Sequence, residues 1–434
     1  MATRYGSKHK YCPPLRAALS VIVVLATLYG YTLAFPFSLR SQTLLPIDHS
    51  SSQRLGGPFA APEGNGTKLW RTWEAMPGAH PLCNPDFLRA QMAPLPFPPQ
   101  INTFQGARPT AAAVTIIGRH AYDAANYKGT NSEIGLERMA HALALNFPSQ
   151  DEYFYSLFGI DYVVLLQEGS GVDCAILNAS HALGWTVWSD GSVPPFCNSG
   201  AVLNSTGLYR SKRGTRIVVK SRDFALPRFL QRKPSLLADP NWLGCGGFRR
   251  DVSYNLYSGA AYSHHVLVEP VLDNYEVTFK MDVDVHFLKR PPLDPLEAIL
   301  GCSIGVTKVF PFEVCNTNTR EAVTYFGTLT GQGAGNAIRK WLIHGDFTYG
   351  MFNAGLSQVL RSARSTVFHT WLYECVEDGY FRYRWGDQAS WTLLTGMWRD
   401  MGEDLKNSTA VCLWPWKQWG TGEGLPVLRH GWSE

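Results

Sequence analysis

Beyond residue 110 the chain alternates continuous apolar runs with amphipathic stretches. The runs at 112–118 and 162–166 are apolar along almost their whole length, as strands buried on both faces are. The stretch between them, 133–146, carries apolar residues at helical spacing, namely Ile134, Leu136, Met139, Leu143 and Leu145. Strand, helix and parallel strand in this order predict an α/β domain with ligand sites at the carboxyl ends of its strands.

The longest apolar segment, residues 17–35, contains no charged residue. As a helix it would span about 28 Å, which is close to the thickness of a bilayer core. The basic residues before it are Arg4, Lys8, Lys10 and Arg16, whereas the next one after it is Arg40. This asymmetry predicts a signal anchor with a cytoplasmic N-terminus. A cleaved signal peptide is the alternative, but the segment is long for one and no small-residue cleavage site follows it.

These patterns divide the chain into four parts. Residues 1–16 form a cytoplasmic tail, 17–35 the anchor, 36–109 a stem rich in Pro, Gly and Ser, and 110–434 a lumenal domain. Acceptor sites for N-glycosylation beyond the anchor agree with this division, at Asn65, Asn178, Asn204 and Asn407. Eight of the nine cysteines also lie beyond the anchor, where disulfides can form, but their pairing is open at this point.

Charge and histidine placement exclude two classes of function. The net charge of +4 is mild, and no block of Lys and Arg stands outside the N-terminal cluster, so a nucleic-acid partner is not expected. His264 and His265 are adjacent, and neighbouring side chains diverge on both helices and strands. We therefore expect these two histidines to be structural and not a zinc pair.

Two acidic residues, Asp282 and Asp284, follow the apolar run that begins at Val277. In an extended backbone, positions two apart point to the same side, so both carboxylates could meet one cation. Mg²⁺ and Mn²⁺ take carboxylate oxygens together with substrate phosphates, which predicts a sugar-nucleotide site. Solvated turn carboxylates are the alternative. Arg119 ends the first strand, where a phosphate or base would lie, although a surface ion pair would explain it equally well.

Several blocks of the sequence resemble one family. The blocks are Val114–His120, Tyr257–His264, Met281–Phe287 and Gly379–Asp387, in that order. They are similar to motifs of the fungal Golgi α-1,2-mannosyltransferases of glycosyltransferase family 15. The resemblance covers about residues 110–434 and implies a GT-A fold, with a central mixed, mostly parallel sheet flanked by helices. It also implies a single-pass type II protein of the Golgi membrane that transfers mannose from GDP-mannose, with Mn²⁺ or Mg²⁺, to a glycan or glycoprotein acceptor.

The resemblance assigns a metal site. Asp282 falls at the family's metal-associated Glu, and Asp284 at its Asp. His430, near the C-terminus, matches the metal-binding His that such enzymes place after the catalytic segment. The alternative for His430 is a terminal surface histidine.

Further roles follow from the other blocks. Asp387 stands in a Trp-Gly-Asp match and is assigned to a sugar hydroxyl, with a helix cap as the alternative. Arg119, Tyr262 and Trp385 are assigned to the nucleotide-sugar. Asn353 stands where the family has a Glu proposed as nucleophile, so a double displacement through this position is not supported and Asn353 would only position substrate.

Three functions remain open on the sequence. A metal-dependent retaining glycosyltransferase accounts for the anchor, the stem and the acidic pair together, and its donor could also be UDP-galactose or UDP-glucose. A lumenal glycoside hydrolase would need two carboxylates that flank the bond. A catalytically inactive carbohydrate-binding protein would explain the missing Glu. Activity that depends on Mn²⁺ and a nucleotide-sugar separates the first from the other two.

Overall fold

The structure is a computed structural model of the chain. Every described residue belongs to one compact unit, Asn65–Glu434. The structure describes residues 78–94, 108–118, 132–167, 182–187, 206–238, 256–299, 304–306, 309–311, 319–330, 346–348, 352–376, 378–382, 390, 411–413 and 427–430. Within these ranges no helix is long and apolar enough to cross a membrane. The predicted tail and anchor lie outside them.

The centre of the described part is a mixed sheet. Its nine described strands lie in the order β12 (Val411–Leu413), β8 (Ile304–Val306), β11 (Phe352–Leu356), β6 (Val277–Met281), β1 (Ala111–Ile117), β2 (Asp161–Gln167), β5 (Arg216–Arg222), β4 (Thr206–Arg210) and β3 (Thr186–Val187). The pairs β12–β8, β6–β1, β1–β2 and β2–β5 are parallel, whereas β11 and β4 run antiparallel to their neighbours. The prediction of a mixed sheet is confirmed. It also expected most of the sheet to be parallel, whereas four of the eight pairs of neighbouring strands are parallel and four are antiparallel.

Two short antiparallel pairs stand beside this sheet. They are β10 (Asp346–Thr348) with β9 (Val309–Pro311), and β13 (Leu428–His430) with β7 (Val285–Phe287). The second pair joins the end of the chain to the segment directly after β6. Residues far apart in sequence therefore meet next to the acidic pair.

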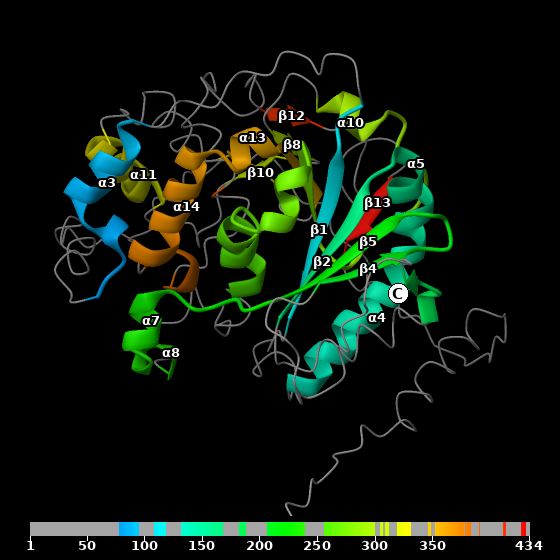
Figure 1. Cartoon of the computed structure of the whole chain (residues 1–434), viewed down its shortest axis with the longest axis horizontal. Coiled ribbons are helices and arrows are strands. Elements are labelled where there is room, and N and C mark those ends of the chain that lie inside the picture. The colour runs from blue at the N-terminus through cyan, green and yellow to red at the C-terminus, as the bar shows by residue number, and fades with distance from the viewer. Residues whose placement is uncertain are drawn as a thin grey trace, which may run out of the picture. The chain divides into compact units, whose positions relative to one another are not determined.

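Helices cover both faces of the sheet (Figure 1). On one face lie α4 (Ser132–Gln150), η2 (Asp151–Tyr155) and α5 (Ser156–Phe158). The other face carries η1 (Pro81–Cys83), α3 (Pro85–Met92), α7 (Arg228–Arg232), η3 (Leu256–His265), α11 (Thr319–Thr330), α14 (Ala363–Cys375) and η6 (Asp378–Arg382). The remaining short helices are α8 (Ser235–Ala238), η4 (Pro270–Asn274), α10 (Pro295–Ala298) and α13 (Ser357–Leu360). The helix predicted at 133–146 is observed within α4.

Each face of the sheet has its own apolar core, and β1 contributes to both. Ala112, Val114 and Ile116 pack toward η3 and α14, whereas Ala113 and Ile117 pack toward α4. A strand buried on both faces is apolar at nearly every position, which is why β1 reads as a continuous run and not as an alternation, with Thr115 as its one polar residue. The buried strand predicted at 112–118 is thereby confirmed.

Residues 78–94 are part of the fold, although the sequence places them in the stem. Asn84 accepts hydrogen bonds from the backbone amides of Asp86 and Phe87, and with the following proline this starts α3. Leu88 and Met92 on this helix are fully buried in the core beside α14. The stem prediction for 36–109 therefore needs correction over this segment, because Pro and Gly around a short helix hid its apolar face.

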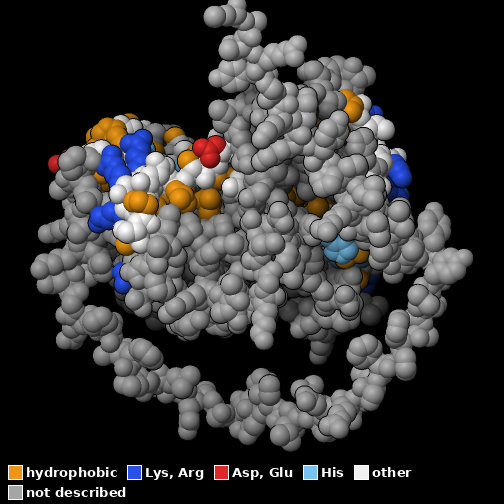
Figure 2. All heavy atoms as spheres, turned by 90° about the horizontal axis from the view of Figure 1, so that it is seen from below, with side chains coloured by type: hydrophobic (Ala, Val, Ile, Leu, Met, Phe, Trp, Pro, Cys, Tyr) orange, Lys and Arg blue, Asp and Glu red, His pale blue; other side chains and the backbone are white. Residues whose placement is uncertain are grey.

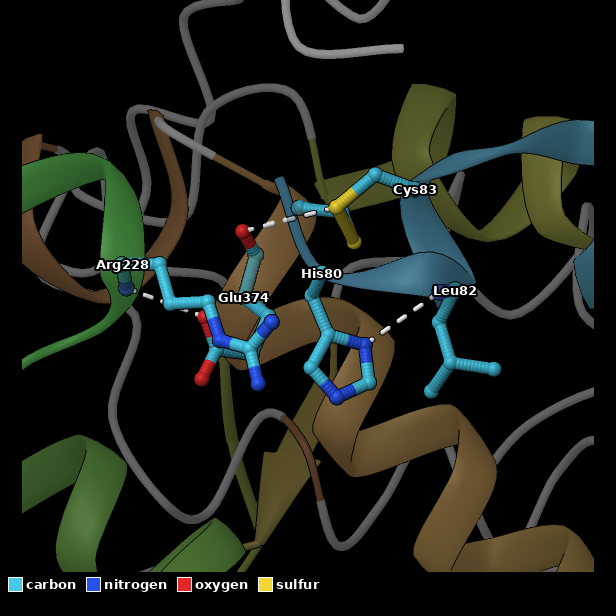
Figure 3. Close-up of a disulfide and its surroundings, with 6 residues drawn as sticks. His80, Leu82, Cys83, Arg228 and Glu374 are labelled. Carbon is cyan, nitrogen blue, oxygen red and sulfur yellow. Dashed lines mark hydrogen bonds between the residues drawn. A yellow bond between two sulfur atoms is a disulfide. The ribbon is translucent and has the colours of Figure 1, made fainter. Parts of the chain in front are cut away.

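A disulfide ties this segment to α14. Cys83 bonds to Cys375, which is 292 residues later, and the two Cα atoms are 5.2 Å apart. Figure 3 shows the bond between η1 and α14, with Glu374 and Arg228 close by. The backbone amide of Arg228 donates to the carboxylate of Glu374, so α7 is joined to the same place. This disulfide provides the pairing that the sequence left open for two of the cysteines.

The described basic side chains are dispersed on the surface. In the view of Figure 2 the visible Lys and Arg side chains lie in separate groups on its left and right parts, next to hydrophobic and uncharged side chains. Among the described residues this view shows no continuous basic surface. The distribution fits the mild net charge.

Candidate functional site

The order of the strands marks the place in the sheet where a ligand site is expected. From β1 the chain moves outward to β2 and β5, and it then returns to add β6 on the other side of β1. Strand order thus reverses between β1 and β6. In open α/β sheets, ligands bind outside the carboxyl ends of the strands at such a point. Asp282 is the first residue after β6.

Strands β1 and β6 separate at this end of the sheet. Their last paired residues are Val114 and Lys280. Beyond them, the hydroxyl of Tyr262 accepts a hydrogen bond from the backbone amide of Ile116 at 2.9 Å and lies 3.4 Å from the carbonyl oxygen of Met281. The hydroxyl of Thr115 donates to the same carbonyl at 3.0 Å. Side-chain hydroxyls therefore replace the ladder bonds where the strands part.

The acidic pair lies in a turn and not in a strand. β6 ends at Met281, and the backbone amide of Val285 donates to the carbonyl oxygen of Asp282 at 3.2 Å. This corrects the extended geometry that the sequence pattern implied for Asp282 and Asp284. Both side chains are half-buried, with the buried Val283 between them. The turn keeps both carboxylates at the end of β6, beside the point where strand order reverses.

A buried lysine stands directly behind the first carboxylate. The Nζ atom of Lys280 lies 2.9 Å from Oδ1 of Asp282 and 4.6 Å from the ring centroid of Tyr262. The lysine side chain is 4 % exposed, whereas that of Asp282 is 27 % exposed. Sequence reasoning missed Lys280, although a charged residue inside an otherwise apolar strand is the signal that could have found it.

The C-terminal strand brings His430 to the same turn. In the β13–β7 register, His430 pairs with Val285, the residue after Asp284, and Arg429 pairs with His286. This places the backbone of His430 beside the turn at residues 282–285, hereafter the acidic turn. The side chain of His430 lies outside the described atoms. On the other side of β7, Nδ1 of His286 lies 3.2 Å from the side-chain oxygens of both Asn146 and Ser149 on α4.

The other predicted site residues are placed unequally. Asn353 on β11 pairs in register with Lys280, so its backbone lies one strand from the buried ammonium. Tyr262 is 5 % exposed and its hydroxyl is engaged with backbone groups, a position that supports Lys280 and differs from the predicted contact with a nucleotide. Arg119, Trp385 and Asp387 lie outside the described residues.

The donor set fits a hard dication only in part. Two carboxylates at a strand end are the ligands that Mg²⁺ and Mn²⁺ prefer. One oxygen of Asp282 is already paired with Lys280. Among the side chains that the structure describes, no group of three His, Cys, Asp or Glu gathers as a metal site. Asp282 and Asp284 therefore provide part of a site whose remaining ligands would come from His430, from substrate or from water.

A separate cluster of histidines lies where η3 packs against α14, with His265 and His369 buried and His264 half-buried. The ring centroids of His264 and His265 lie 5.0 Å apart, and His264 stacks on Tyr373 of α14 at 4.6 Å. His369, also on α14, is fully buried, and neither of its ring nitrogens has a hydrogen-bond partner among the described residues. Burial lowers the pKa of His264 and of His369 to about 3. These rings are neutral core residues, in agreement with the structural role expected for the His264–His265 pair.

Comparisons with known proteins give matches only among solved structures. No protein-family model matches the chain, and no curated protein matches it either. Core-mannan synthase A (CmsA/Ktr4) from Aspergillus fumigatus, in its Mn/GDP form, matches with 12% identity and a TM-score of 0.43, over 70% of this chain and 74% of that one. The mannosyltransferase Ktr4p from S. cerevisiae matches with 13% identity and a TM-score of 0.42, over 74% of this chain and 76% of that one.

A third solved structure that matches is a xylosyltransferase. Mouse xyloside xylosyltransferase 1 has 13% identity and a TM-score of 0.35, over 74% of this chain and 97% of that one. These three solved structures are a core-mannan synthase, a mannosyltransferase and a xylosyltransferase. At these identities and TM-scores the likeness does not by itself transfer an activity or a ligand to this chain.

Proposed function

We propose that this chain is a glycosyltransferase that takes its sugar from a nucleotide donor. The observation that carries the proposal is the position of Asp282 and Asp284, in the turn after β6, where strand order reverses beside β1. A nucleotide-sugar needs a site at the carboxyl ends of parallel strands and a means to neutralise its diphosphate. The acidic turn stands at those strand ends and can hold the cation that does so.

The acidic turn would hold a Mn²⁺ or Mg²⁺ ion with Asp282 and Asp284. When bound, such an ion stabilises negative charge on the departing diphosphate. The chain's own residues prepare this place. Lys280 pairs with the carboxylate of Asp282, and the ring of Tyr262 supports Lys280. The hydroxyl of Tyr262 connects β1 and β6 through Ile116 and Met281. His430 is proposed as a further ligand, supported by its backbone pairing with Val285.

The residues around the sugar are assigned by the sequence resemblance. Asp387 would accept a hydrogen bond from a sugar hydroxyl beside Trp385, and Arg119 would meet the phosphates or base at the end of β1. Asn353, whose backbone lies next to that of Lys280, would position substrate through its amide. An amide cannot form the glycosyl ester that a carboxylate nucleophile would, so a front-face departure is the mechanism proposed for a retaining reaction.

The donor proposed is GDP-mannose and the acceptor a glycan hydroxyl on a glycoprotein, from the same resemblance. The compartment proposed is the Golgi membrane, with residues 17–35 as a single anchor and the catalytic domain in the lumen. The disulfide between Cys83 and Cys375 supports this address, because such bonds persist in oxidising compartments and are rare in the cytosol.

Full-length protein, purified in detergent without reductant, tests the proposal. It is incubated with GDP-mannose, UDP-galactose or UDP-glucose and a glycan acceptor, with and without Mn²⁺, and released nucleotide is measured. We expect release with one donor, dependent on the metal and decreased at least about 100-fold in Asp282→Asn and Asp284→Asn. Asp86→Asn, the same change in an exposed ion pair on α3, is the matched control. Full activity in both site variants, with or without metal, would refute the proposal.

A carbohydrate-binding protein without activity is the second candidate. The observation that favours it is the amide at Asn353, where the resembled family has a carboxylate. In the same assay this candidate predicts binding of a glycan or nucleotide-sugar with no release of nucleotide beyond that of a blank. Turnover in the wild-type protein would exclude it.

A further inference from the structure

Lys280 is a charged residue in a position that normally takes an apolar one. It stands in the fully buried strand β6, whose neighbours are β1 and β11, and its side chain is 4 % exposed. Lysine is almost never buried to this extent unless its charge is paired. Lys280 pairs with Asp282, the first carboxylate of the proposed site, at 2.9 Å.

The surroundings of Lys280 fix its ammonium in place. The group lies 4.6 Å from the ring centroid of Tyr262, a favourable cation–π position. The ring itself is held by the hydrogen bond from Ile116 to its hydroxyl and by the nearby carbonyl of Met281. A buried ammonium held in this way does not reach a substrate in solution. Lys280 would therefore act on the site through Asp282, as a positioning residue.

The ion pair between Lys280 and Asp282 decreases the negative charge of the acidic turn. Asp282 and Asp284 alone carry two negative charges, and the ammonium of Lys280 offsets one of them at a distance of 2.9 Å from the first carboxylate. In a partly buried site, screening by water is weak, so this offset is felt strongly by any incoming ion. A dication meets a weaker attraction than two bare carboxylates would exert. A nucleoside diphosphate brings additional negative oxygens and restores it.

We propose that Lys280 is a built-in counter-cation that weakens binding of a divalent ion by the free chain and makes that binding depend on the nucleoside diphosphate. The inference rests on the proposed function, because it takes the acidic turn as the place of the ion. It adds Lys280 to the proposed function and predicts that the chain binds the ion tightly only when the diphosphate is also bound.

Mn²⁺ binding by the full-length protein tests this inference without any turnover. Free Mn²⁺ is measured by electron paramagnetic resonance with the metal alone and with GDP or UDP added. In Lys280→Met, whose unbranched side chain is one atom shorter and carries no charge, we expect Mn²⁺ alone to bind at least about tenfold more tightly. The dependence on nucleotide should shrink by the same factor. Lys280→Arg keeps the charge and should behave as the wild type does.

Two results would overturn the inference. One is Lys280→Met binding Mn²⁺ as the wild type does or more weakly, while Asp282→Asn shows that the turn holds the ion. The other is wild-type protein binding Mn²⁺ equally well with and without diphosphate, which needs no variant at all. Lys280→Gln provides a second neutral side chain if the Met variant does not fold, and its expected result is the same. A wild-type chain that binds neither Mn²⁺ nor a nucleoside diphosphate overturns the proposed function as well.

Discussion

His264 on η3 and His369 on α14 should make the folded chain sensitive to acid. Burial lowers the pKa of His264 and of His369 from 6.5 to about 3, with positively charged neighbours adding to the effect at His264. The unfolded chain takes up protons on these rings as the pH falls through 6.5, whereas the folded chain does not until about pH 3. Stability is therefore complete above pH 6.5 and is lost progressively below it.

The size of the effect follows from the pKa difference. Each such histidine decreases the free energy of unfolding by about 1.4 kcal/mol per pH unit below its unfolded pKa. Between pH 7 and pH 5 this amounts to roughly 2 kcal/mol for each ring, or roughly 4 kcal/mol for His264 and His369 together. His265, whose pKa burial also lowers, acts in the same direction. Asp161 and Glu374, whose pKa values burial raises, act in the opposite direction at lower pH.

His369→Phe isolates one ring from this sum. The variant keeps an aromatic ring in the core and removes two buried nitrogens that lack hydrogen-bond partners among the described residues. We expect the loss of stability between pH 7 and pH 5, measured by urea unfolding of the full-length protein, to be smaller by roughly 2 kcal/mol. Phe368→Leu, at the neighbouring buried position of α14, removes no titrating group and is the control for a change in packing alone; it should leave the pH profile unchanged. A profile for His369→Phe that parallels the wild type would refute the reasoning.

Two further changes test interactions that join distant parts of the fold. Cys83→Ser removes a disulfide between residues 292 positions apart, and we expect the free energy of unfolding, measured in urea, to decrease by about 2–5 kcal/mol. Cys375→Ser should give the same decrease, and the double variant should be no less stable than either single variant. Tyr262→Phe leaves the buried amide of Ile116 without its partner, so we expect the free energy of unfolding to decrease by about 1–3 kcal/mol. Mn²⁺ binding should keep its dependence on nucleotide, because the aromatic ring beside Lys280 remains. Unchanged stability would show that the hydroxyl does not hold β1 and β6 together.

The fold class could be predicted because the central strands are buried on both faces. Such strands have no polar side, so 112–118 and 162–166 stand out as continuous apolar runs and are observed as β1 and β2. The strand order could not be predicted in the same way. It depends on the return of the chain to add β6 beside β1 and to insert the antiparallel β11, and both pairings are nonlocal.

The stem shows how composition can mislead. Residues around 78–94 are rich in Pro and Gly, which favoured a linker, yet Pro85 after Asn84 is a helix start and Cys83 has its partner on α14. A short helix that buries only Leu88 and Met92 has too few apolar positions for a periodic signal. Its place in the core depends on the disulfide and on α14, and neither is visible from the local sequence.

The candidate site was predicted by residue type, and its geometry was not. Carboxylates after an apolar strand identified Asp282 and Asp284. Whether they are extended or in a turn depends on where β6 ends, and it ends at Met281, before both of them. Lys280 could have been noticed as a charge inside an apolar strand, but its burial could not be predicted, because it depends on the ring of Tyr262 from another element. A strand of this composition would expose its lysine if the ring and the carboxylate were not both present. The charge of the acidic turn is therefore a property of three elements, β6, η3 and the turn itself, and metal binding at this place should respond to changes in each of them.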